Sequence, residues 1–147
     1  QMIVRFRQDV IDLHPQAVHI MAGTNDIAGN TGAATMATVE GNIKTMAELA
    51  RAHGIKVMLA SIPPSVKYNW QPSIDPQPSN AAMNAWLKAY AKRNGFIYVD
   101  YYAVLNDGDG GFKAGYSSDG THPSVAGFAA MRPVAQRAVK EALKAAR

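Results

Sequence analysis

Hydrophobic positions divide the start of the chain into a helix-like segment and a strand-like segment. Apolar side chains recur at helical spacing, at Met2, Ile3, Phe6, Val10 and Leu13. This spacing predicts an amphipathic helix. Because Pro15 disfavours helical backbone in the residue before it, the helix should end near His14. The short apolar run AVHIM, residues 17–21, is typical of a buried strand.

Helix-like and strand-like patterns continue to alternate along the rest of the chain. Helices are expected over residues 34–53, 81–93 and 124–145, and strands over residues 56–61 and 96–100. The segments between them are polar or rich in glycine and proline, and residues 62–79 form a proline-rich loop. Pro133 should kink or split the last helix, because proline lacks the N–H that a helix interior needs.

The order of these elements predicts the class of fold. Helices alternate with short strands that are apolar almost throughout, as in a parallel sheet that is buried on both faces. We therefore expect a three-layer α/β structure, with helices on both faces of the sheet and a single domain over residues 1–147. Ligands bind such sheets beyond the carboxyl ends of the strands. Two polar clusters fall there, one after the first strand and one after the third.

The first polar cluster is AGTNDIAGN, residues 22–30. Gly23 would let the backbone leave the strand and approach a ligand closely. The amide of Asn25 could donate a hydrogen bond to a developing oxyanion, and the carboxylate of Asp26 could accept from backbone N–H groups of the loop. The simpler alternative is a turn rich in glycine and asparagine, as turns usually are.

The second polar cluster is SSDGTHP, residues 117–123. His122 can take and return a proton near neutral pH. A carboxylate three residues earlier, Asp119, can reach its Nδ1–H, select the tautomer and stabilise the imidazolium. Gly120 permits the tight bend between them. The alternative is an ordinary Asp/Gly turn with a helix-capping residue.

Composition removes several classes of function. The absence of cysteine excludes disulfides, thiolate catalysis and cysteine-based zinc sites. No apolar run reaches the ~18 residues of a membrane-spanning helix, so no transmembrane segment is expected. The net charge is +4, but the basic residues are spread along the chain. A solvated helix face accounts for those in the last helix, and no nucleic-acid partner is expected.

Two loops carry other candidates for binding. The segment DGDGGFKAGYSS, from Asp107, invites a calcium interpretation, but it lacks the glycine and glutamate that an EF-hand needs at its sixth and twelfth positions. An ordinary loop is favoured there. Tyr68 and Trp70 in the proline-rich loop could line a pocket for the substrate. Packing of these aromatic rings against the body of the protein is the equal alternative.

Taken together, the two polar clusters resemble the GDSL/SGNH esterase–lipase family. GTND, residues 23–26, is similar to its Gly-x-Asn-Asp block, and DGTHP, residues 119–123, to its final Asp-x-x-His block. SIPP, residues 61–64, also looks like that family. The resemblance implies a flavodoxin-like fold and no metal or organic cofactor. It also implies that His122 is the general base, that Asp119 orients it, and that Asn25 donates to the oxyanion.

The nucleophile that the resemblance implies is missing from this chain. The family supplies it in a Gly-Asp-Ser block, followed by a Gly block, both upstream of Gly-x-Asn-Asp. Residues 1–22 contain no serine, and no other serine follows a strand-to-helix elbow with flanking glycines. We therefore expect a C-terminal portion of such a hydrolase, with its N-terminal strands and its serine outside this chain. Residues 17–21 would then border a vacant strand position, which a homodimer could also cover.

The expected activity follows from this resemblance. The intact protein should hydrolyse carboxylic, short-chain acyl esters by a Ser-His-Asp mechanism through an acyl-enzyme, whereas this chain alone should be inactive. The substrate would be a small-molecule, carbohydrate or lipid ester, and an extracytoplasmic location is slightly favoured. The alternative is a non-catalytic module of the same fold that binds a carbohydrate or an ester.

Overall fold

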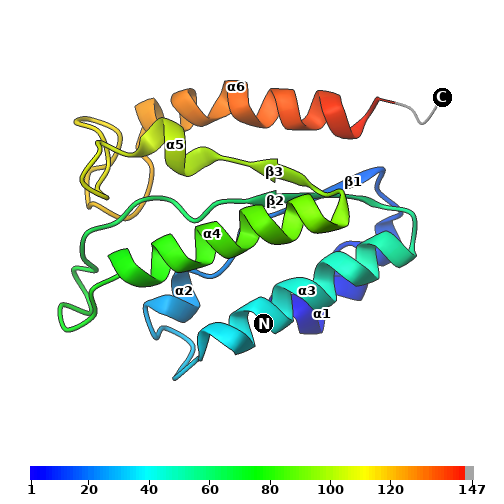
Figure 1. Ribbon diagram of the computed structural model, residues 1–147, viewed down its shortest axis with the longest axis horizontal. Coiled ribbons are helices and arrows are strands. Elements are labelled where there is room, and N and C mark those ends of the chain that lie inside the picture. The colour runs from blue at the N-terminus through cyan, green and yellow to red at the C-terminus, as the bar shows by residue number, and fades with distance from the viewer. Residues whose placement is uncertain (145–147) are drawn as a thin grey trace.

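Three parallel strands form the centre of the molecule. The structure is a computed structural model that describes residues 1–144. Strands β1 (Ala17–Ile20), β2 (Lys56–Ala60) and β3 (Ile97–Val99) pair in the order β1-β2-β3 (Figure 1). The register places Val18 opposite Val57, and Leu59 opposite Tyr98. The predicted parallel sheet is therefore confirmed, and β1 pairs on one side only within the described residues.

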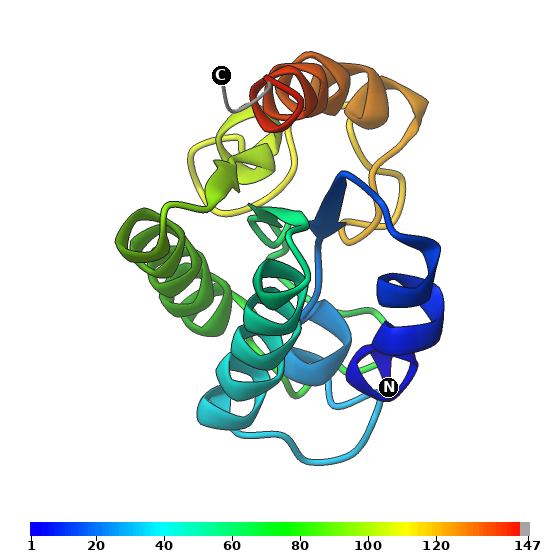
Figure 2. The ribbon, with the colours of Figure 1, turned by 90° about the vertical axis from the view of Figure 1, so that its right-hand side faces the viewer.

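Helices cover both faces of this sheet. They are α1 (Met2–Asp9), the 3₁₀ helix η1 (Ile11–Leu13), α2 (Thr24–Ile27), α3 (Met36–Ala52), α4 (Gln77–Asn94), α5 (Tyr101–Leu105) and α6 (Val125–Ala142). Figure 2 looks along the strands and shows α3 and α4 on one face and α6 on the other. Helix α1 packs beside α3, and α5 packs beside α6. The expected three-layer α/β arrangement is confirmed.

The middle strand shows why both faces are covered. Successive side chains of a strand point to opposite faces. Val57 and Leu59 belong to the hydrophobic core with α3 and α4, whereas Met58 and Ala60 belong to the core with α6. All of these side chains are buried. Four successive apolar side chains, residues 57–60, therefore need a helical layer on each side of the strand.

Several element boundaries differ from those predicted by the sequence. Helix α4 begins at Gln77, inside the segment expected to be a proline-rich loop, with Pro78 in its first turn. Proline is tolerated there because the first N–H groups of a helix have no intrahelical partner. Pro133 lies within α6, which is not split. The last predicted helix was expected to reach residue 145, which lies outside the described residues.

Two short helices occupy segments that were expected to be loops. Helix α2 follows Gly23 at the end of β1, and α5 follows Asp100 at the end of β3. Asp100 caps α5 by accepting a hydrogen bond from the Ala103 N–H at 3.0 Å. Four or five residues show too little periodicity for sequence patterns to detect. Both helices lie at the carboxyl ends of strands.

Gly127 allows α6 to approach the loop that carries the second polar cluster. A Cβ atom at this position would collide with the carbonyl oxygen of Tyr116. That same oxygen accepts a hydrogen bond from the Ser124 N–H at 2.8 Å, and the Ser124 hydroxyl caps α6 through the Gly127 N–H. A side chain at Gly127 would therefore disturb the junction between this loop and its helix.

We predict that Gly127→Ala lowers the free energy of unfolding by about 1–3 kcal/mol, as overpacking does elsewhere. Gly41→Ala is the matched control, because Gly41 also lies inside a helix and a Cβ there meets no atom within 4 Å. This control should raise stability by about 0.4–1 kcal/mol through lower entropy of the unfolded chain. Urea unfolding of the variants measures both effects. Equal changes in both would contradict the proposed collision.

Candidate active site

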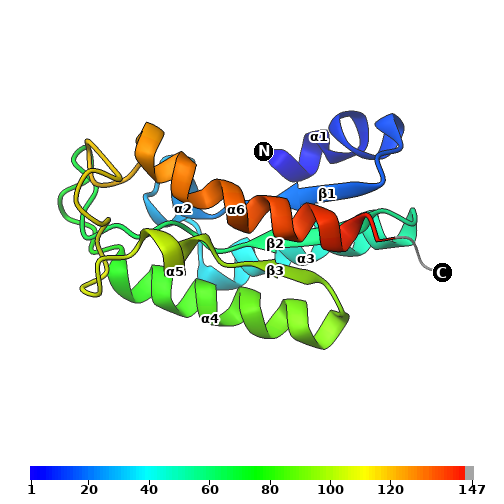
Figure 3. The same cartoon turned by 90° about the horizontal axis from the view of Figure 1, so that it is seen from above.

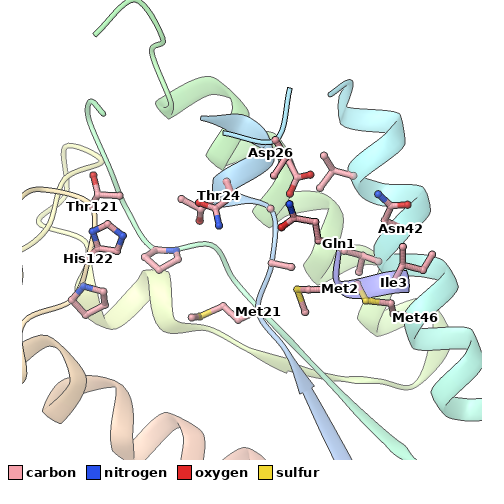
Figure 4. Close-up of a pocket in the computed structure, with 18 residues that line it drawn as sticks. Gln1, Met2, Ile3, Met21, Thr24, Asp26, Asn42, Met46, Thr121 and His122 are labelled. Carbon is pink, nitrogen blue, oxygen red and sulfur yellow. The ribbon is translucent and has the colours of Figure 1, made fainter. Parts of the chain in front are cut away.

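The two polar clusters lie at one end of the sheet. Because the strands are parallel, the loops that follow them emerge at the same edge (Figure 3). A cavity of about 320 Å³ lies there, and its wall includes Gly23, Asn25, Thr121 and His122. Figure 4 shows Thr121 and His122 at one end of this cavity and Met2 and Met46 toward the other. That second end is mixed, because Gln1 and Asn42 lie there beside the methionines.

Asp119 and His122 form a direct hydrogen-bonded pair. The His122 Nδ1 lies 2.7 Å from the Asp119 Oδ2. An ionised carboxylate only accepts hydrogen bonds, so Nδ1 carries the proton and donates it. In the neutral ring this leaves Nε2 without a proton. His122 therefore presents a proton acceptor on the side of the ring away from Asp119.

The Asp119 carboxylate is held by its own turn. Its Oδ1 accepts from the His122 and Thr121 backbone N–H groups, both at 2.8 Å, and from the Ser117 hydroxyl at 3.2 Å. The His122 backbone N–H, then its ring, then the Thr121 N–H hold the pKa of the Asp119 carboxyl well below its usual range. Hydrogen bonds to the charged form have this effect. Asp119 therefore remains ionised beside His122 at neutral pH.

Asn25 lies on α2 and lines the same cavity as His122. Gly23 precedes it with a positive φ of 119°, and a Cβ there would come within 3.0 Å of the Ile62 Cδ1. The backbone angle thus favours glycine, and a Cβ would also require the end of the Ile62 side chain to move by a few tenths of an ångström. The sequence hypothesis for Asp26 is not supported, because no backbone N–H of the described chain donates to its carboxylate. Asp26 instead lies along the cavity wall.

The proline-rich loop packs against the second polar cluster. The Asn69 side chain donates to the Asp119 carbonyl oxygen at 3.0 Å. The Trp70 ring stacks with His122, with 6.1 Å between centroids, and with Tyr68, at 5.3 Å. Asn69 escaped the sequence analysis because its partner is 50 residues away. No local spacing could have indicated that contact.

Tyr68 has the packing role that the sequence left open. Its side chain is fully buried, and burial raises the pKa of its hydroxyl to about 12. Trp70 is partly exposed, at 45%. Neither ring contributes to the wall of the cavity described above. Trp70 contacts His122 rather than the interior of that cavity.

The hydrogen bonds that serine hydroxyls form within residues 1–144 go to groups other than the His122 ring. Ser61 is fully buried, and its hydroxyl accepts from the Tyr102 N–H at 2.8 Å. The Ser65 hydroxyl donates to the Lys67 carbonyl oxygen, and the Ser117 hydroxyl to Asp119. Across residues 1–144, no serine hydroxyl is hydrogen-bonded to the His122 ring.

The described residues 1–144 contain neither a metal-ligating cluster nor a membrane-spanning helix. No group of three or more His, Cys, Asp or Glu side chains there could hold a metal ion. Over the same residues, no helix has both the length and the hydrophobicity to cross a bilayer.

The fold and the paired Asp119 and His122 can be compared with known proteins. The GDSL-like Lipase/Acylhydrolase family matches residues 1–130. The chain belongs to this family. No match was found among curated proteins. Family membership supports ester hydrolysis in general.

Solved structures place the chain in the same family. A GDSL-like lipase from Bacteroides thetaiotaomicron is 40% identical, with a TM-score of 0.92 over 96% of this chain and 70% of that chain. A candidate acylhydrolase from Bacteroides fragilis is 43% identical, with a TM-score of 0.92 over 97% of this chain and 69% of that one. A catalytic mutant of an acetylxylan esterase from Geobacillus stearothermophilus shares the fold, at 20% identity and a TM-score of 0.76 over 94% of this chain and 65% of that chain.

The lowered pKa of Asp119 predicts a specific dependence of stability on pH. Above the ordinary aspartate pKa of about 3.9, Asp119 is ionised in both folded and unfolded protein, and its contribution to stability is complete. As the pH falls further, the unfolded state takes up the proton first, so this contribution declines. It is lost once the pH falls through the lowered pKa of the folded state.

Asp119→Asn should therefore flatten the acid part of the stability curve. The measurement is the free energy of unfolding in urea between neutral pH and about pH 2.5. Asp109→Asn is the control, since no hydrogen bond to the Asp109 carboxylate is found within residues 1–144, and it should keep the wild-type slope. An unchanged slope in Asp119→Asn would show that the turn does not stabilise the charge of Asp119.

Proposed function

We propose that the intact protein hydrolyses carboxylic esters with short acyl chains through a covalent acyl-enzyme. The observation that carries this proposal is the pair formed by Asp119 and His122 on the same cavity as Asn25. Membership of the lipase and acylhydrolase family supports ester hydrolysis. The pair supplies a proton acceptor, and Asn25 supplies a donor for negative charge.

In the proposed reaction, the nucleophile is a serine from outside residues 1–147. The two Bacteroides structures support this assignment, because this chain matches only 70% and 69% of their lengths. The serine oxygen attacks the carbonyl carbon of the ester while His122 Nε2 takes its proton. Asn25 donates a hydrogen bond to the oxyanion that forms. His122 then returns the proton to the departing alcohol, which leaves an acyl-serine.

Hydrolysis of this acyl-enzyme repeats the same steps with water. His122 takes a proton from the water as its oxygen attacks the acyl carbon, and it returns that proton to the serine as the carboxylic acid leaves. The Asp119 carboxylate stabilises the imidazolium in both halves. It is suited to this role because hydrogen bonds from its own turn keep it ionised.

A short acyl group is the substrate class that we propose for the intact protein. The acetylxylan esterase among the similar folds suggests acetylated carbohydrate as a class to test. Turnover of p-nitrophenyl acetate, p-nitrophenyl octanoate and acetylated xylan by the intact protein tests this proposal. Faster turnover of the octanoate would contradict the preference for a short acyl chain.

His122→Ala should lower kcat for p-nitrophenyl acetate by at least about 10⁴-fold, because residues of such a triad act as one unit. Asp119→Asn should lower it by about 10⁴-fold by removing the acceptor that selects the tautomer. His53→Ala is the control, since His53 lies at the exposed end of α3. Hydrolysis at the wild-type rate by His122→Ala would remove this histidine from the mechanism.

Asn25→Ala should lower kcat by about 10²–10³-fold, the usual effect of losing one oxyanion donor. KM should change little, because the interaction becomes strong only in the transition state. Asn94→Ala is the control, because Asn94 lies at the end of α4 and outside that cavity. A rise in KM with unchanged kcat would assign Asn25 to substrate binding instead.

A further inference from the structure

A continuous path of side-chain contacts connects Asn25 with His122. The Trp70 Nε1–H donates to the Asn30 Oδ1 at 2.7 Å, and the Asn30 Nδ2 donates to the Asn25 Oδ1 at 3.0 Å. At its other end, the Trp70 ring stacks with His122 at an interplanar angle of 24°. Two residues outside the proposed reaction, Asn30 and Trp70, thus join its oxyanion donor to its base.

Hydrogen-bond polarity makes this path directional. An indole N–H can only donate, so Trp70 must face the carbonyl oxygen of the Asn30 side chain. The NH₂ group of Asn30 must then face Asn25. A donor at that position selects the carbonyl oxygen of the Asn25 amide. The NH₂ group of Asn25 is thereby left free to donate to a substrate.

The two ends of this path are anchored independently of it. The Asn30 backbone N–H donates to the Asn25 carbonyl oxygen at 2.9 Å, which closes the segment around α2. Trp70 packs against the fully buried Tyr68, and its neighbour Asn69 binds the Asp119 carbonyl oxygen. The indole is therefore held by the same loop that binds the His122 turn.

We propose that Trp70 and Asn30 are positioning residues. They orient the Asn25 amide so that its NH₂ group faces the oxyanion, and they hold that amide in a fixed position relative to the His122 ring. This inference rests on the proposed ester hydrolysis. When the directional path is broken, the Asn25 amide can rotate and present its oxygen to the developing negative charge. That orientation repels the transition state but leaves the uncharged substrate almost unaffected, so kcat should fall while KM stays nearly constant.

The sharpest variant is Asn30→Asp in the intact protein. A carboxylate still accepts the Trp70 N–H but cannot donate to the Asn25 Oδ1, so it attracts the Asn25 NH₂ group and reverses that amide. With p-nitrophenyl acetate, kcat should fall by about 10²–10³-fold, as for loss of the oxyanion donor. A rise in KM without a fall in kcat would overturn the proposal.

A double-mutant cycle separates positioning from a general loss of structure. In the Asn25→Ala background the amide is already absent, so adding Asn30→Asp should change kcat by less than about 3-fold. Independent effects that multiply would overturn the proposal. Thermal unfolding of each variant identifies any that fail to fold.

Trp70→Phe tests the other end of the path, because it keeps an aromatic ring for stacking but removes the N–H donor. It should lower kcat in the wild type and have little further effect in Asn25→Ala. Trp86→Phe is the matched control, because Trp86 stacks with Tyr90 on α4, away from the site. Equal losses of kcat in the two tryptophan variants would overturn the proposal.

A measurement without substrate distinguishes failure of this inference from failure of the proposed function. In the NMR spectrum of the intact protein, the Trp70 indole N–H should exchange slowly with water and should exchange faster in Asn30→Ala. The Trp86 indole signal should not change. If the wild type hydrolyses no ester, the proposed function fails, whereas the exchange rates still report on the path. An unchanged Trp70 exchange rate in Asn30→Ala would overturn the path itself.

Discussion

The Asp119 carboxylate is the group on which the arrangement of the site depends. One oxygen accepts backbone N–H groups of Thr121 and His122, and the other accepts the His122 ring. Both the path of the backbone and the direction of the imidazole are therefore set by the same charge. Because the turn itself supplies these donors, the carboxylate stays ionised, and no lysine or arginine among residues 1–144 is paired with it. A short turn can in this way hold a histidine whose side chain remains largely exposed to solvent.

The fold supplies the rigid base for this turn. Helix α6 begins directly after this turn and is capped by the Ser124 hydroxyl. It packs on the sheet through buried side chains that include Met131 and Ala138. Gly127 lets the helix come close to Tyr116, whose carbonyl oxygen binds the Ser124 N–H. The packing of α6 on the sheet thus fixes the first turn of this helix, and that turn fixes the position of His122. Apolar packing in the core therefore determines where the His122 ring lies in the site.

Coupling between the two halves of the site comes from the proline-rich loop. It crosses from the end of β2 and contacts both the His122 turn, through Asn69 and Trp70, and the α2 segment, through Asn30. Each of these contacts is between side chains or a side chain and the backbone. The geometry between Asn25 and His122 therefore depends on a segment without regular structure.

The sequence by itself predicted the order of the long helices and of the strands, the parallel three-layer sheet, and the pair formed by Asp119 and His122. These follow from local rules, because periodicity reports which side of an element is buried and because a turn of four residues contains both members of the pair. The short helices α2 and α5 and the start of α4 could not be predicted, since they depend on capping and on contacts with the sheet. Only the tertiary structure placed Tyr68 in the core and joined Trp70 to Asn30, 40 residues away. Contacts between residues so far apart in the sequence depend on how the loops pack against one another at the end of the sheet. Local spacing along the chain does not predict that packing.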